Sequence, residues 1–148
     1  EPTMAGKPAR PLLEATCTRL GCHRPIFVGD RLDTDILGAR NAGITSLFVL
    51  TGAHGVHDLM DAGPDRRPDH IGADLGALLE PPQRVVVDGD AARCDGQLVR
   101  QIDGDLEVDL TNHDMAAQLS GVRALLELVW TDRVPVNHDA LSVFDLLH

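Results

Sequence analysis

Residues 25–52 read PIFVGDRLDTDILGARNAGITSLFVLTG, and this stretch decides the fold. The apolar run at 25–28 is too short for a helix and ends on Gly-Asp, so it predicts a strand followed by a tight turn. A second apolar run at 45–50 is rich in residues that favour strands and is followed by Thr-Gly. The residues between the two runs predict a helix. The stretch is therefore expected to form a strand–helix–strand unit.

Capping residues predict where the neighbouring helices begin and end. Asp33 and Thr34 are the expected N-caps of the middle helix, and Gly43 is expected to end it. An earlier helix is expected over residues 9–20, because apolar and polar residues interleave there and Gly21 stands where a C-terminal cap belongs.

The alternation of helices and strands continues beyond this stretch. A short helix is expected at 56–61, a strand at 70–71 and a helix at 75–80. Apolar strands that alternate with helices are typical of an α/β fold, a parallel sheet covered on both faces. Ligands of such sheets bind beyond the carboxyl ends of the strands. Asp30 and residues 51–52 follow two of the strands, so both are expected on that rim.

The composition excludes several classes of protein. The chain of 148 residues has 43% hydrophobic and 24% charged residues, which are ordinary values for a folded protein. Its 13 Lys+Arg against 23 Asp+Glu give a net charge of −10, which disfavours a nucleic-acid-binding surface. The sequence has no apolar run that could span a membrane. With 3 cysteines and no signal-peptide pattern at its start, the chain is expected in the cytoplasm.

The sequence pattern changes after Pro81-Pro82, so we expect one domain over residues 1–82 and a second over 83–148. The second domain is expected to be a small α+β module. Its expected strands lie at 84–87, 97–102 and 106–110, around a turn-rich stretch.

Two helices are expected at the end of this module. Residues 111–114 predict a capping box for the first helix, and a final helix is expected at 139–147. The first helix is expected to bury one face, which carries Met115, Leu119, Val122, Leu126 and Val129.

Three carboxylates crowd the turn after the first strand. Asp30, Asp33 and Asp35 repel one another unless a cation or hydrogen-bond donors neutralise them. Mg²⁺ binds oxygen ligands, and it commonly uses one or two protein carboxylates while water and phosphate complete its shell. The cluster therefore predicts a metal site. The alternative is a strand–turn–helix corner whose acids only favour the helix N-terminus.

Lys7 is the only lysine among the 13 Lys+Arg residues, and it lies in the triplet Gly6-Lys7-Pro8. A compact ammonium on a flexible stem suits the screening of a phosphoryl group and a neighbouring carboxylate. Taken alone, however, the triplet favours a solvated lysine before a helix.

Together, GKP at 6–8, GDRLDTD at 29–35 and LTG at 50–52 strongly resemble the haloacid dehalogenase (HAD) phosphatase superfamily. The closer match is its branch of p-nitrophenyl phosphatases, nucleotidases and glycerol 3-phosphate phosphatases. The resemblance covers about residues 2–82 and implies half of a Rossmann-like HAD core. Members of this family hydrolyse phosphate esters through an aspartyl-phosphate intermediate.

The resemblance implies a role for each matching residue. Lys7 would bind the phosphoryl group and stabilise the aspartyl nucleophile. Asp30 would ligate Mg²⁺, and Asp35 would support the metal-bound waters and the lysine. Asp33 fills a variable position and is only a possible contributor.

The family's nucleophile motif, DxDGT/V, and its cap domain would precede Lys7. We therefore expect this chain to be the C-terminal portion of a longer phosphatase, with its own N-terminal HAD segment and cap domain as partners. Residues 85–90 imitate the nucleophile motif, but Ala91 and Ala92 stand where Gly and Thr or Val belong. A hairpin turn is expected there instead.

Other chemical patterns are weaker. Cys17, Cys22 and His23 suggest zinc but lack a second paired set, so buried or half-buried thiols are expected. His54 and His57 lie in the loop after the second strand, where a substrate contact and a solvated loop are both open.

The resemblance implies a Mg²⁺-dependent phosphomonoesterase for small phosphorylated metabolites, with glycerol 3-phosphate as the favoured substrate. The alternative is a non-catalytic α/β module kept for binding or assembly. The 83–148 module faintly resembles part of a GNAT acetyltransferase, but it lacks the pyrophosphate-binding loop, so acetyl-CoA binding is not expected. Whether the protein forms a homo-oligomer is left open.

Overall fold

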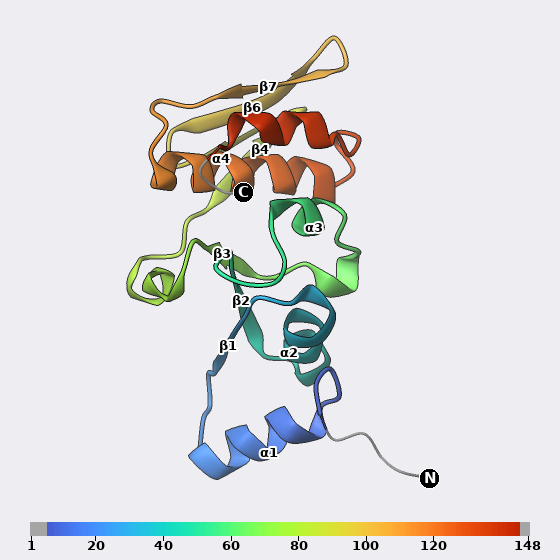
Figure 1. Ribbon diagram of the computed structural model, residues 1–148, viewed down its shortest axis with the longest axis vertical. Helices are drawn as coiled ribbons and strands as arrows, with labels where there is room; N and C mark the ends of the chain where they lie inside the picture. The colour runs from blue at the N-terminus through green and yellow to red at the C-terminus, as the bar shows by residue number, and fades with distance from the viewer. Residues whose placement is uncertain (1–5, 146–148) are drawn as a thin grey trace. The chain divides into compact units, whose positions relative to one another are not determined.

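The computed structural model describes residues 6–145, which form two compact units (Figure 1). The first unit contains the residues up to His54 together with Ala62–Leu75. The second contains Gly55–Asp61 together with the residues from Gly76 onward. The short segment 55–61 thus belongs to the second unit, although it interrupts the first unit in sequence.

The first unit is built on a parallel sheet of three strands, as the sequence predicted. The strands β1 (Ile26–Gly29), β2 (Thr45–Val49) and β3 (His70–Gly72) lie in the order β1-β2-β3. The central strand, β2, is buried from Ser46 onward, whereas β1 is only half-buried. Within the described residues, β1 pairs with β2 alone, so its other edge carries no strand.

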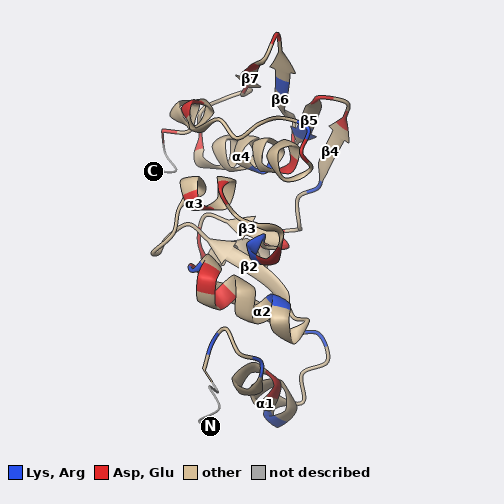
Figure 2. Ribbon diagram, turned by 90° about the vertical axis from the view of Figure 1, so that its right-hand side faces the viewer, with Lys and Arg blue, Asp and Glu red and all other residues tan. Residues whose placement is uncertain are grey.

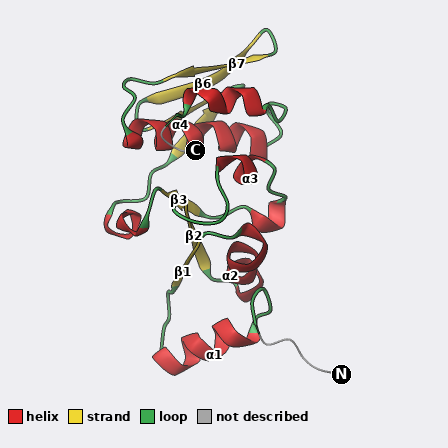
Figure 3. Cartoon of the chain, viewed as in Figure 1, coloured by secondary structure: helices red, strands yellow, loops and turns green. Residues whose placement is uncertain are grey.

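Two helices of this unit end where the sequence predicted. The helices are α1 (Pro11–Leu20) and α2 (Leu37–Ala42) (Figure 3). Each is closed by a glycine in the left-handed region, Gly21 at φ 62° and Gly43 at φ 67°.

The predicted N-caps of the middle helix are wrong. A five-residue π-helical turn, η1 (Leu32–Ile36), precedes α2, and its N-cap is Arg31, which makes no side-chain cap. Asp33 and Thr34 therefore lie inside the turn. Asp33 is not available as a cap, because both of its carboxylate oxygens accept hydrogen bonds from Arg31.

A carboxylate joins β3 to the centre of the sheet. Asp69, just before β3, accepts hydrogen bonds from the backbone N–H of Ser46 (2.8 Å) and from its hydroxyl (2.9 Å). The Ser46 hydroxyl oxygen in turn accepts from the Asp69 N–H at 3.0 Å. Because these polar groups satisfy one another, Ser46 is buried in β2 without an unpaired donor.

The second unit contains an antiparallel sheet with consecutive neighbours. Its strands are β4 (Val85–Asp88), β5 (Ala91–Cys94), β6 (Gln97–Ile102) and β7 (Asp105–Asp109). The strand β5 was not predicted, because the sequence there indicated only turns. The hairpin turn predicted for residues 85–90 is confirmed, since β4 and β5 pair across Gly89-Asp90.

Helix α4 (Met115–Trp130) packs against β4, β5 and β6 within this unit. It is almost uncharged, as Figure 2 shows. The predicted apolar stripe is buried at its four later positions, but Met115 is 41% exposed, so that position was wrong. Among residues 6–145, no helix has the length and apolar character needed to cross a membrane.

The ends of the last two helices differ from the predictions. Asp114 is itself the N-cap of α4 and accepts from the Ala117 N–H at 2.8 Å, whereas Thr111 bonds to Gln97 on β6. The final helix is a 3₁₀ segment, η4 (His138–Val143), and residues 146–147 of its prediction lie outside the described residues.

The remaining short segments are α3 (Val56–Met60), η2 (Pro64–Arg66) and η3 (Leu75–Leu79). The first was predicted as a helix and is one. The helix predicted at 75–80 is a 3₁₀ turn. The domain boundary at Pro82 stays a prediction.

Candidate active site

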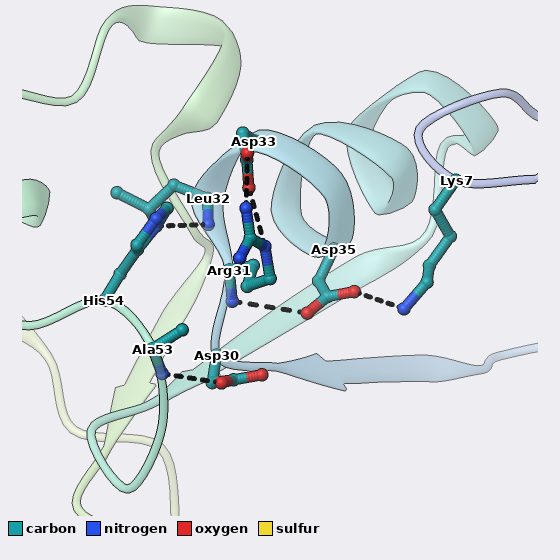
Figure 4. A network of polar contacts seen from close by, with 8 residues as sticks. All are labelled: Lys7, Asp30, Arg31, Leu32, Asp33, Asp35, Ala53 and His54. Carbon is teal, nitrogen blue, oxygen red and sulfur yellow. Dashed lines mark hydrogen bonds and ion pairs between the residues drawn. The ribbon is translucent and has the colours of Figure 1, made fainter.

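The carboxylate of Asp30 lies immediately after β1, where the strand ends at the rim of the sheet. Its Oδ2 atom accepts a hydrogen bond from the Ala53 N–H at 2.7 Å (Figure 4). The Asp30 backbone carbonyl accepts from the His54 N–H at 3.2 Å. The loop that follows β2 therefore binds Asp30 through both its side chain and its backbone.

The side chain of His54 also connects this loop to η1. Its Nδ1 atom accepts the Leu32 N–H at 3.0 Å, so Nδ1 is unprotonated and the ring proton lies on Nε2. The His54 ring is therefore hydrogen-bonded to the backbone of η1. His57 lies on α3, where its ring centroid is 5.2 Å from that of His138.

Two glycines make room for the carboxylates. A methyl group on Gly52 would overlap the side chain of Asp30, and a methyl group on Gly29 would lie 2.6 Å from Asp35 Oδ2. Both contacts are too short for real atoms, so each carboxylate occupies space that any side chain on the glycine would fill.

Lys7 and Asp35 meet although they are far apart in sequence. Lys7 Nζ lies 2.6 Å from Asp35 Oδ1, and the Asp35 side chain is only 6% exposed, against 40% for Lys7. Asp35 Oδ2 accepts the Arg31 N–H at 3.2 Å. The ammonium also lies 5.7 Å from the centroid of the Phe27 ring. Both oxygens of Asp35 are therefore engaged, and its charge is balanced.

Asp33 has a different partner. Its two oxygens accept from the guanidinium of Arg31, at 3.1 Å from Nε and 2.8 Å from Nη2. These hydrogen bonds, and the positive charge that makes them, hold the pKa of Asp33 below its usual range and raise the pKa of Arg31. The pair is about half exposed, so it contributes little to stability.

The three carboxylates that the sequence grouped together are thus distinguished by their free oxygens. Asp35 and Asp33 use both of theirs in ion pairs and hydrogen bonds. Asp30 uses Oδ2, and no residue in the range 6–145 donates a hydrogen bond to its Oδ1. Asp30 is therefore the member of the cluster that is available to a ligand.

No group of three or more His, Cys, Asp and Glu side chains among residues 6–145 is arranged to hold a metal ion. This finding covers Cys17, Cys22 and His23, for which zinc was considered. Cys17 is half-buried as expected, but Cys22 is exposed, so the expectation of a buried or half-buried thiol was wrong there. Within the described residues, Asp30 is thus not part of a complete set of metal ligands.

The contribution of the loop after β2 was only partly visible in the sequence. The rim position of Thr51-Gly52 was expected, but the donor to Asp30 is the backbone N–H of Ala53. A backbone donor carries no residue-type signal. The small residue Gly52, next to it, is the one feature that could have indicated a close approach.

Comparison with known proteins places the first half of the chain in a family. A family model described as HAD-hydrolase-like matches residues 4–78, about half of the chain. D-glycerol 3-phosphate phosphatase of Mycobacterium tuberculosis is 45% identical over 87 residues, which are 59% of this chain and 25% of that protein. Phosphoglycolate phosphatase 2 of Arabidopsis thaliana is 39% identical over 87 residues, covering 55% of this chain and 29% of that protein. The chain spans little more than a quarter of the length of these relatives.

Solved structures extend the likeness to the second unit. The crystal structure of glycerol phosphate phosphatase from Mycobacterium tuberculosis in complex with magnesium matches with a TM-score of 0.65 and 33% identity. The match covers 99% of this chain and 44% of that one. The relatives are named phosphatases, and the family model spans the residues that form the site. The chain belongs to the HAD-hydrolase-like family.

Proposed function

We propose that this chain is part of a Mg²⁺-dependent phosphomonoesterase that acts on a small phosphorylated metabolite, with glycerol 3-phosphate as the first substrate to test. The observation that carries the proposal is the 2.6 Å ion pair between Lys7 and Asp35, in the same unit as the available carboxylate of Asp30. The matching relatives named as glycerol phosphate phosphatases support the choice of substrate.

The residues present fit a magnesium ion in part. Mg²⁺ commonly takes one or two protein carboxylates and leaves other positions to water and phosphate. Asp30 would supply a carboxylate oxygen, and the Ala53 N–H fixes its other oxygen at 2.7 Å. When bound, the ion would polarise a phosphoryl oxygen and neutralise charge that develops during transfer.

Lys7 and Asp35 have complementary roles in this proposal. The Lys7 side chain is 40% exposed, so its ammonium is accessible to a phosphoryl group while it remains paired. Asp35, nearly buried, orients that ammonium and keeps its position fixed before substrate arrives. A cation placed in advance stabilises negative charge in the transition state without the cost of reorganisation.

The nucleophile is proposed to lie on a segment outside this chain, together with the cap domain that the family resemblance implies. One edge of β1 pairs with no strand among residues 6–145, and this supports the proposal, since Asp30 lies at the carboxyl end of β1. A further parallel strand on that edge would bring its own carboxyl end beside Asp30. An aspartate there would attack phosphorus to give an aspartyl-phosphate, which water then hydrolyses.

The test uses the complete protein and measures phosphate release from glycerol 3-phosphate, phosphoglycolate, 4-nitrophenyl phosphate and nucleoside monophosphates, with and without Mg²⁺. Asp30→Asn should lower kcat by about 10²–10³, the range seen when one group that stabilises the transition state is removed. Asp33→Asn is the matched control. It changes a carboxylate three residues away that is paired with Arg31, and it should stay within about twofold of wild type.

Two results would overturn the proposal. One is near-wild-type hydrolysis by Asp30→Asn at saturating Mg²⁺. The other is the absence of Mg²⁺-dependent phosphate release from every substrate, which would favour the non-catalytic binding or assembly module instead. Equal losses in Asp30→Asn and Asp33→Asn would show that the acidic turn acts through its overall charge alone.

A further inference from the structure

We infer that Asn41 is a positioning residue for Lys7. Its side-chain amide binds the backbone of the turn formed by residues 6–9, and so it holds the base of the lysine while Asp35 holds its tip. All of these residues belong to the first unit. The inference rests on the proposed function for its consequence in catalysis, and it names a residue to which that function assigns no role.

Burial does not hold Lys7 in place. Its side chain is 40% exposed, and Gly6 before it is exposed as well. A lysine side chain is long and flexible, so an ion pair at its tip leaves the backbone beneath it free to move. The position of the ammonium therefore depends on what fixes the turn that carries it.

The partner of the ammonium is itself fixed. Asp35, 2.6 Å from the Lys7 ammonium (Figure 4), has a side chain that is only 6% exposed. It lies against Gly29, where an added methyl group would come within 2.6 Å of Oδ2. The same oxygen accepts the Arg31 N–H at 3.2 Å. Asp35 therefore cannot follow a displaced lysine, and the turn must bring the lysine to it.

Two contacts attach the turn to α2. Pro8 packs over Gly38, since a methyl group on that glycine would lie 3.5 Å from Pro8 Cα. The side-chain Nδ2 of Asn41 donates to the Pro8 carbonyl at 2.9 Å. Gly38 and Asn41 are three positions apart, so they are neighbours on one face of the helix. Apolar packing has no preferred direction, whereas a hydrogen bond does, so the Asn41 bond is the contact that sets the orientation of the turn.

Asn41 and Asp35 belong to one continuous helical segment, because η1 runs directly into α2. The segment therefore holds the lysine twice, through its ammonium and through the carbonyl of the next residue. In the proposed reaction, a phosphoryl group competes with Asp35 for the ammonium. The bond from Asn41 to Pro8 takes no part in this competition, so it keeps the lysine in place while its tip is shared with substrate.

The experiment is NMR spectroscopy of this chain with ¹³C-labelled lysine, without metal or substrate. The two Hε protons of Lys7 give separate signals when the side chain holds one conformation, and the signals merge as it becomes mobile. Asn41→Ala removes the donor, and alanine favours a helix more than asparagine does, so α2 should stay folded. The separation of the two signals should shrink.

Amide exchange gives a second measurement on the same variant. The Ala9 N–H donates to the Gly6 carbonyl at 2.9 Å and closes the turn. In Asn41→Ala, the Ala9 amide should exchange with solvent about fivefold faster, which is the factor expected for the loss of one neutral hydrogen bond.

Arg40→Ala is the matched control. It removes a long, exposed side chain from the adjacent position of α2 and leaves the bond from Asn41 to Pro8 in place. Both measurements should match wild type. Asn41→Asp is the second variant for the case that Asn41→Ala does not fold. Its side chain is nearly the same size but has no donor, so it should reproduce both effects.

A smaller signal separation together with faster Ala9 exchange, in a folded Asn41 variant but not in Arg40→Ala, supports the inference. A wild-type value of either measurement in a folded Asn41 variant overturns it. Equal effects in Arg40→Ala also overturn it, and so do Hε signals that already coincide in wild type.

In the complete enzyme, Asn41→Ala should lower kcat about fivefold and change KM less than about twofold, because a cation placed in advance acts on charge that develops in the transition state. An unchanged kcat in an active enzyme would overturn the role of Asn41 in catalysis. The NMR and exchange measurements require no activity, so failure of the proposed phosphatase is distinguished from failure of this positioning role.

Discussion

Substitution of Gly52 by alanine tests the space in which the Asp30 carboxylate lies. The added methyl group would overlap Oδ2, Cβ and Cγ of Asp30. Because Cβ is attached directly to the backbone, Asp30 cannot escape by rotating only its outer atoms. The carboxylate must move, and the 2.7 Å bond from Ala53 must then break.

The magnitude follows from three effects. Loss of a hydrogen bond to a charged group costs about 1.5–3 kcal/mol, and overpacking adds about 1–3 kcal/mol. The smaller entropy of the unfolded chain returns about 0.4–1 kcal/mol. Gly52→Ala should therefore lower the free energy of unfolding by about 3 kcal/mol, which is roughly a hundredfold change in the folding equilibrium.

Gly55→Ala is the matched control, since it lies in the same loop and a methyl group there meets nothing within 4 Å. Its φ of −123° is accessible to alanine, so it should be neutral or slightly stabilising. Urea denaturation followed by circular dichroism measures both variants. In the complete protein, Gly52→Ala should also lower kcat by about 10² or more. If both variants are equally stable and equally active, the argument that Asp30 requires a glycine at position 52 is refuted.

Three further predictions concern charge and thiol chemistry. Lys7→Met should lower the free energy of unfolding by about 2 kcal/mol, because it leaves the buried carboxylate of Asp35 without its cation. A double-mutant cycle with Asp35→Asn measures this interaction, and a coupling free energy below about 0.3 kcal/mol would contradict the prediction. The depressed pKa of Asp33 contributes stability that is present above about pH 4. Asp33→Asn should therefore have a slightly lower melting temperature than wild type at pH 7. This difference should vanish as the pH falls through the depressed pKa of Asp33. A thiol reagent at pH 8 should modify Cys22 first and Cys94 last, because Cys22 is exposed whereas burial raises the pKa of Cys94. Equal modification rates of these two thiols in the folded protein would be evidence against the packing of β5.

The parallel half of the fold was predictable because its signals are local. Short apolar runs gave β1 and β2, and glycines in the left-handed region ended α1 and α2. By contrast, β5 has the sequence AARC, which has little strand propensity of its own. It is a strand because β4 and β6 pair with it on both sides, and such pairing is a property of the whole sheet.

The candidate site was predictable as a set of residue types but not as a set of contacts. The three acids of the turn look alike in sequence, but their partners differ. Asp33 pairs with Arg31, and Asp35 pairs with Lys7. Of the three, only Asp30 has a carboxylate oxygen available to a ligand. The same engagement explains why Asp33 is not an N-cap, because an acid paired with a guanidinium does not cap a helix. The assignment of segment 55–61 to the C-terminal unit depends on contacts more than 70 positions apart, and no local pattern predicts these.

The lysine count of this chain has a practical consequence. With one side-chain amine in 148 residues, an acylating reagent or an amine-coupled dye has a single internal target, and that target is the group paired with Asp35. The mass added per chain, after correction for the terminal amine, therefore measures how often this one ammonium is released. Occupancy of the rim by any anion can be followed in the same way, without an enzymatic assay.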